Sequence, residues 1–135
     1  MRNKETRQKK GDVKSQQLLG LLLGQAGAGK TFTIRQLAEE QEWDISFTAT
    51  THAAAAELDG CTINEACQLG PNMDSFNYDS IPSDKFTKIR QRLQDVDVLV
   101  IDEVSMLTPV TLARIDLHLR CAFNKDYVFG GKDIV

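Results

Sequence analysis

The chain has 135 residues, of which 41% are hydrophobic and 26% are charged, and its formal net charge is −3. This length suffices for one domain with its own core and excludes two ordinary domains, while the composition is that of a soluble globular protein. The longest apolar run, Leu18–Leu23, is far shorter than the ~20 residues that a membrane-spanning helix needs, so we expect no membrane association.

The charge is distributed unevenly along the chain. Residues 1–14 carry six Lys or Arg and two acidic residues, whereas residues 15–135 carry ten basic and seventeen acidic residues. A basic arm of this kind can bind nucleic acid, although a solvated, flexible terminus is the simpler interpretation. The arm lacks the apolar stretch of a secretion signal, and the three cysteines form no Cys-x-x-Cys pair, which indicates reduced thiols and no zinc site. We therefore expect an intracellular protein of cytoplasm or nucleus.

Short strands and helices alternate through the first half of the body. The pattern predicts strands at Leu18–Leu23 and Ile45–Thr48, and helices at Lys30–Glu42, His52–Leu58 and Thr62–Leu69. Leu18–Leu23 ends at a glycine, as a buried strand does, and the alanine-rich helix is expected to begin after Thr50 or Thr51 as its cap.

The second half continues the alternation. Its pattern predicts a loop over Gly70–Pro82, a helix at Lys85–Leu93 with its apolar residues on one face, a strand at Val96–Ile101, a helix from Thr108-Pro109 to about Phe123, and a strand beginning at Asp133. The run Val96–Ile101 is β-branched and nearly all apolar, which is typical of a central parallel strand covered on both faces. The fold class that follows is α/β, a mainly parallel sheet between helices.

A phosphate-binding loop follows the first predicted strand. It matches the pattern G-x-x-x-x-G-K-[ST] without a mismatch over Gly24, Gln25, Ala26, Gly27, Ala28, Gly29, Lys30 and Thr31. Glycines allow several backbone N–H groups to point at one anion, and the helix that starts near Lys30 adds the positive end of its dipole. In this pattern Lys30 reaches the β- and γ-phosphates of a nucleotide, and the Thr31 hydroxyl coordinates Mg²⁺. We therefore expect ATP and Mg²⁺ as cofactors.

Two carboxylates follow the strand Val96–Ile101. Asp102 and Glu103 stand at its carboxyl end, which is the edge of a parallel sheet where ligands bind. Asp102 is expected to hold the magnesium ion, and Glu103 to orient and deprotonate the attacking water. Phosphoryl transfer also needs an arginine, but Arg114 and Arg120 are more simply interpreted as solvated helix positions or members of a surface ion pair.

Further motifs resemble one family of helicases. Thr48–Ala54 reads Thr-Ala-Thr-Thr-His-Ala-Ala, Thr62-Ile63-Asn64 follows it, and Asp102–Met106 reads Asp-Glu-Val-Ser-Met. With the phosphate loop, their order resembles superfamily 1 DNA helicases of the PIF-type and RecD-type branch, over about residues 17–135. The resemblance implies the first RecA-like domain, a phosphate-loop three-layer sandwich that is incomplete here. We therefore expect residues 15–135 to be this partial ATP-binding domain, preceded by the flexible basic arm of residues 1–14 that the charge distribution indicates.

The resemblance also implies a function and a partner. Family members translocate on single-stranded DNA and unwind duplexes at the expense of ATP, and Thr48, Thr50, Thr51 and Thr62 would contact the DNA backbone, as small hydroxyl side chains can. Strand propensity and helix capping explain these threonines about equally well. A second motor domain is expected to complete the machinery, so we expect this chain alone to lack full activity.

Some positions depart from the family pattern and leave alternatives open. Asn64 stands where the family has His, Ala28 replaces a Thr or Ser, and Gln16 and Gln17 lie close to the phosphate loop for a glutamine that reads adenine. A phosphate-loop kinase, an AAA-type ATPase, or an inactive nucleotide- or DNA-binding module that uses the basic arm are the other interpretations.

Overall fold

Parallel strands form the sheet of the computed structural model, which describes residues 16–70 and 81–135. The strands are β1 (Ile45–Ala49), β2 (Cys61–Thr62), β3 (Val98–Ile101) and β4 (Asp133–Ile134), in the spatial order β2-β1-β3-β4. β3 pairs with β1 on one side and with β4 on the other, and all of its residues are buried. The central parallel strand predicted from the apolar run is therefore confirmed.

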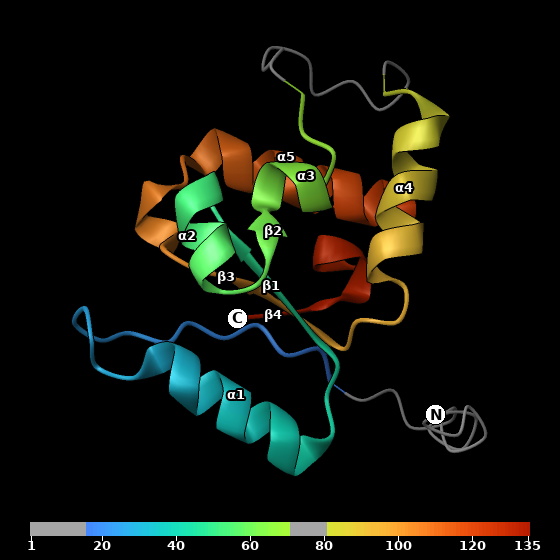
Figure 1. Ribbon diagram of the computed structural model, residues 1–135. Helices are drawn as coiled ribbons and strands as arrows, with labels where there is room; N and C mark the ends of the chain where they lie inside the picture. The colour runs from blue at the N-terminus through green and yellow to red at the C-terminus, as the bar shows by residue number, and fades with distance from the viewer. Residues whose placement is uncertain (1–15, 71–80) are drawn as a thin grey trace.

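Helices lie on both sides of this sheet (Figure 1). They are α1 (Lys30–Gln41), α2 (His52–Glu57), α3 (Ile63–Ala66), α4 (Ser83–Leu93) and α5 (Pro109–Ala122), with 3₁₀ turns η3 (Val104–Met106) and η4 (Val128–Gly131). The side chains of Thr51, Thr62 and Thr108 accept hydrogen bonds from the first turns of α2, α3 and α5, so each caps its helix. The predicted helices are confirmed to within a few residues at their ends.

The main hydrophobic core lies between the sheet and helices α3, α4 and α5. Its fully buried members include Ile89 and Leu93 of α4, Ile115 and Leu119 of α5, and Leu99 of β3. These residues recur at helical spacing on one face of each helix, which is why α4 and α5 pack against the strands. Within the described residues, no helix is long and apolar enough to cross a membrane.

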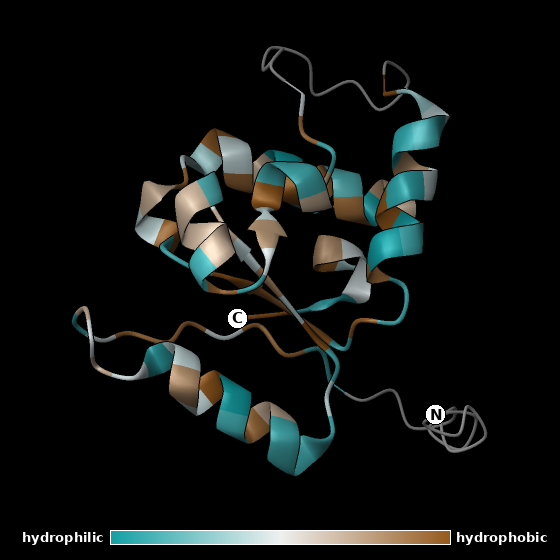
Figure 2. Cartoon of the chain, viewed as in Figure 1, coloured by the Kyte–Doolittle hydropathy of each residue, from teal (hydrophilic) through white to brown (hydrophobic). Residues whose placement is uncertain are grey.

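Among the residues that the structure describes, the predicted strand Leu18–Leu23 forms one bridge, between Leu19 and Ile134 of β4. It is not buried as expected: Leu21 and Leu23 are 65% and 79% exposed, and Phe32 of the neighbouring α1 is 67% exposed. An apolar strand becomes buried only when other elements cover it. In Figure 1 α1 lies on the side of the sheet opposite α2–α5, and its Arg35 reaches the carbonyl oxygen of Leu58 at 3.0 Å. Figure 2 shows this uncovered apolar stretch in brown before α1.

Two further differences concern short or undescribed segments. β2 spans only Cys61–Thr62, where the pattern indicated a helix from Thr62, because Thr62 both ends the strand and caps α3. The predicted loop falls largely on residues 71–80, and the basic arm on residues 1–14, both of which lie outside the described residues.

Candidate functional site

The loop Gly24–Gly29 connects the segment beside β4 to the first turn of α1. Gly27 and Gly29 have positive φ angles of 77° and 84°, a backbone conformation that glycine adopts without steric cost. A Cβ atom at either position would meet nothing within 4 Å, so conformation and not crowding calls for glycine here. The loop is exposed, so its backbone N–H groups are accessible to an anion apart from that of Ala28, which donates to the carbonyl oxygen of Gln25 at 3.1 Å.

Lys30 is the cation of this loop. Its Nζ donates hydrogen bonds to the carbonyl oxygens of Gly24 and Gln25, at 2.7 Å and 3.0 Å. The ammonium group of Lys30 thus lies against the backbone of the loop. Within the described part of the chain, it has no carboxylate partner. Thr31, in the first turn of α1, is half-buried. This donor set, a cation beside glycine N–H groups, fits a phosphate.

Asp102 and Glu103 follow β3 directly. The N–H of Asp102 donates to the carbonyl oxygen of Thr48 at 2.8 Å, which extends the pairing between β1 and β3 by one bond. Asp102 is half-buried, while Glu103 is exposed and has a left-handed backbone with φ 53°. Such conformations are uncommon for residues other than glycine and cluster at functional sites.

The phosphate loop and the two carboxylates lie at the same edge of the sheet. The segment around Leu19 runs parallel to β4, and β4 runs parallel to β3, so the carboxyl ends of all three point the same way. Ligands of open parallel sheets bind at this edge. Among the described residues, no hydrogen bond or ion pair joins Lys30 to Asp102 or Glu103.

The four threonines expected to contact DNA have different surroundings. Thr48 is fully buried, and its hydroxyl donates to the carbonyl oxygen of Val100 at 2.7 Å. Thr51 and Thr62 use their hydroxyls as helix caps, and Thr62 forms a reciprocal capping box with Glu65. The hydroxyl oxygen of Thr50 is buried and has no hydrogen-bond partner in the part of the chain that the structure describes.

Thr50 and Thr62 line the same polar hollow, which has a volume of about 450 Å³. It is lined by Thr50, His52, Thr62, Asn64, Glu65, Gln68, Leu69 and Lys85. The motif segment after β1 and the one after β2 therefore lie beside each other at this hollow. The order of the motifs in the sequence did not establish that proximity. Lys85, from α4, was not predicted to be a site residue, because a lysine on a helix face carries no signal of its own.

The arginines of α5 do not complete the phosphate site. Arg114 is buried, with 6% exposed, and its Nη1 donates to the carbonyl oxygen of Gly70 at 3.4 Å. The prediction of a solvated position was therefore wrong for Arg114, because α5 packs that face inward. Arg120 forms the expected ion pair, with its Nε 2.9 Å from Oδ1 of Asp116.

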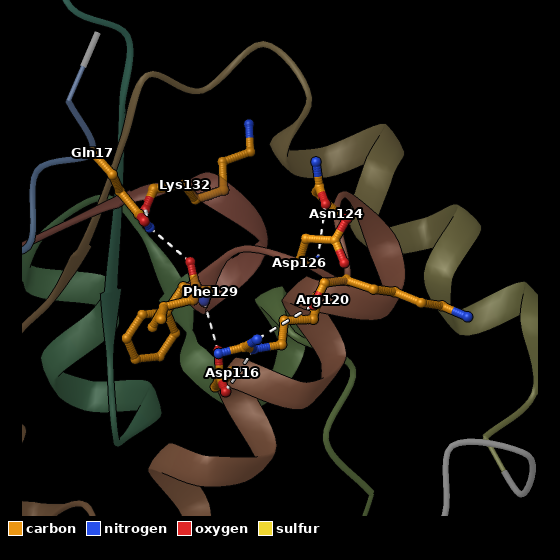
Figure 3. Close-up of polar contacts among 9 residues, drawn as sticks. Gln17, Asp116, Arg120, Asn124, Asp126, Phe129 and Lys132 are labelled. Atoms are coloured by element: carbon orange, nitrogen blue, oxygen red, sulfur yellow. Dashed lines mark hydrogen bonds and ion pairs between the residues drawn. The ribbon is translucent and has the colours of Figure 1, made fainter. Parts of the chain in front are cut away.

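Asp116 also holds the turn that precedes β4, as Figure 3 shows. Its Oδ1 accepts a hydrogen bond from the N–H of Phe129 at 2.6 Å. The side-chain amide of Gln17 donates to the carbonyl oxygens of Val128 and Lys132, both at 2.7 Å. Gln17 therefore ties the segment before the phosphate loop to η4.

Comparison with known proteins identifies the family. A family model described as an AAA domain matches residues 8–122. The chain belongs to this family. Among curated relatives, this AAA domain is 31% identical over 117 residues to the ATP-dependent DNA helicase Pif1 of Psychrobacter and 26% identical over 117 residues to the PIF1 helicase of Saccharomyces cerevisiae. These matches cover 84% and 83% of this chain but 18% and 14% of the relatives.

Solved structures agree with the sequence relatives. Unliganded Pif1 from Bacteroides matches with a TM-score of 0.70 and 26% identity, over 100% of this chain and 30% of that chain. Bacteroides Pif1 in complex with ADP-AlF4 matches with a TM-score of 0.68 and 29% identity, over 83% of this chain and 26% of that one. The expected RecA-like phosphate-loop fold and the resemblance to Pif1-type helicases are confirmed, and the AAA domain spans less than a third of these relatives.

Proposed function

We propose that this AAA domain is the ATP-binding part of a DNA helicase that couples ATP hydrolysis to movement along single-stranded DNA and to duplex unwinding. The observation that carries the proposal is topological: the loop Gly24–Thr31 and the pair Asp102-Glu103 follow parallel strand segments at one edge of the sheet. Relatives named as ATP-dependent DNA helicases, and a related structure in complex with ADP-AlF4, support it.

Each residue of the site has a proposed role. The loop N–H groups and Lys30 hold the phosphates, for which Lys30 exchanges its two carbonyl partners for charged oxygens. Thr31 and Asp102 offer the hydroxyl and carboxylate oxygens that Mg²⁺ accepts beside nucleotide phosphates, and the bound ion would neutralise developing charge there. Glu103, exposed after β3, takes the proton of the attacking water.

Single-stranded DNA is the proposed partner at the threonines. Bacteroides Pif1 bound to single-stranded DNA matches this chain with a TM-score of 0.64 and 30% identity. The proposal keeps Thr51, which is exposed, and Thr50 and Thr62, which line the polar hollow. Thr48 is neither exposed nor part of the hollow's lining, and it has the role of joining β1 to β3. We further propose that a second motor domain supplies the missing arginine, so that this chain alone hydrolyses ATP slowly or not at all.

A titration with a fluorescent ATP analogue tests the nucleotide site. Lys30→Ala removes a charged phosphate contact and is expected to weaken binding in magnesium by about 10- to 100-fold. Lys88→Ala removes a charge from an exposed position on α4 and is the control. Equal affinities for Lys30→Ala and the unaltered chain would show that the loop is not the site. Rapid DNA-stimulated ATP hydrolysis by the isolated chain would contradict the proposed need for a second domain.

A further inference from the structure

We propose that the polar hollow between α2, α3 and α4 is a subsite for one phosphodiester group of single-stranded DNA, with Lys85 as its cation. The inference rests on the proposed function and adds a residue outside the helicase motifs to the DNA-binding surface. Lys85 stands 21 positions after Asn64 in the chain, yet both line the same hollow.

Lys85 is positioned by tertiary packing. It lies in the first turns of α4, whose Ile89 and Leu93 are buried in the core, and it is half-buried itself. A Cβ atom on Gly70 would lie 3.3 Å from its Nζ, so the ammonium group lies close to the backbone there. Within the described residues it forms no ion pair. A half-buried ammonium without a counter-ion gains from binding an anion.

Thr50 gives a second, independent observation. Its buried hydroxyl has no hydrogen-bond partner among the described residues, and Thr50 lines the hollow. A buried hydroxyl without a partner costs about 1–3 kcal/mol, and rotation of the Thr50 side chain toward the hollow would let a ligand supply the partner. A phosphate oxygen accepts a hydrogen bond from a hydroxyl and carries the charge that Lys85 complements.

Both signs of charge occur around the hollow. Among the described residues, Glu65 is the acidic residue that lines it, and its Oε2 accepts the N–H of Thr62 in the capping box, which ties this carboxylate to the start of α3. Burial lowers the pKa of His118 of α5, and the positive charges of Arg114 and Lys85 lower it further, so Lys85 lies within electrostatic reach of His118.

Lysine acetylation footprinting on the full chain, with and without oligo(dT), tests the subsite directly. Lys85 is expected to be protected by oligo(dT), while Lys88, one helical turn away and exposed, is not. The method reads each lysine separately, so protection that is confined to the basic residues 1–14 would overturn the subsite.

Fluorescence anisotropy with labelled oligo(dT) compares the DNA affinities of matched variants. Lys85→Gln is expected to weaken binding severalfold and to reduce the slope of log affinity against log salt by about 0.7, the value for one phosphate contact on a single strand. Lys88→Gln removes the same charge from the same helix and is expected to leave the slope unchanged. Thr50→Val is expected to weaken binding while the melting temperature stays the same or rises, a combination that a purely structural role would not produce.

The outcomes separate the two proposals. If the unaltered chain does not bind oligo(dT), both the subsite and the proposed DNA partner are wrong. If it binds, but Lys85→Gln and Lys88→Gln behave alike and Lys85 is not protected, the subsite is wrong and the proposed function stands.

Discussion

The hydroxyl of Thr48 donates a hydrogen bond to the carbonyl oxygen of Val100, 2.7 Å away, between the two central strands. The carbonyl oxygen of the same threonine accepts the N–H of Asp102 at 2.8 Å. Thr48 therefore connects the end of β1 to the residue that follows β3 and bears the proposed magnesium-binding carboxylate. A side chain that is fully buried in this way stabilises the site's framework and does not face DNA.

The first prediction follows from this contact. Thr48→Val keeps the shape of the side chain and removes its hydroxyl, so we expect the free energy of unfolding to fall by about 1 kcal/mol. Binding of oligo(dT), measured under conditions where the variant is folded, should not change. Urea unfolding and fluorescence anisotropy measure the two quantities. A loss of DNA affinity without a loss of stability would restore Thr48 to the DNA-binding set.

Asp116 is expected to stabilise the fold by holding the turn that precedes β4. Asp116→Ala leaves the N–H of Phe129 and the guanidinium of Arg120 without their shared acceptor, which should cost about 1–3 kcal/mol in unfolding free energy. Lys88→Ala breaks an ion pair of 3.6 Å whose two side chains are 59% and 66% exposed, and should cost less than about 0.5 kcal/mol. Similar losses in the two variants would contradict the role given to Asp116.

His118 should make stability depend on pH. Burial lowers its pKa from the ordinary 6.5, although its Nδ1 donates to the carbonyl oxygen of Cys67 at 2.8 Å. The unfolded chain therefore takes up a proton on this group at a higher pH than the folded chain. Its contribution to stability is present above 6.5 and is lost as the pH falls toward the lowered folded value.

Unfolding free energies measured between about pH 7.5 and about pH 5.5 check this, with one group contributing a slope of at most about 1.4 kcal/mol per pH unit. His118→Gln should have a flatter profile than the unaltered chain. His52→Gln, at an exposed position, serves as the matched control. Parallel profiles for all three proteins would mean that His118 does not titrate differently on unfolding.

The three free cysteines should differ in reactivity. Cys67 is fully buried, and burial, with a smaller contribution from Cys61, raises its thiol pKa to about 12. Because the thiolate is the reactive form, iodoacetamide at mildly alkaline pH should alkylate the half-buried Cys61 and Cys121 before Cys67. Mass spectrometry of the labelled peptides measures the order, and urea should equalise the three rates. Early labelling of Cys67 in the folded chain would contradict its burial.

Local patterns predicted the helices and the central strand well. Thr108-Pro109 marked the start of α5, and the spacing of Ile89 and Leu93 identified the buried face of α4, because capping and amphipathic periodicity are properties of neighbouring residues. The strand Leu18–Leu23 was less well predicted, since its burial depends on what covers it and not on its own apolar residues.

By itself, the sequence determined the α/β alternation, the phosphate loop Gly24–Thr31 and the acidic pair after β3, because each is a short run whose chemistry depends on residue type and spacing. The tertiary structure alone decided that Thr48 is buried, that Arg114 packs inward, and that Lys85 joins Thr50 in one hollow. Such relationships bring together residues from separate elements, and their distances follow from how the helices pack on the sheet. The count of 135 residues, which at first indicated one domain, corresponds to less than a third of the related helicase structures.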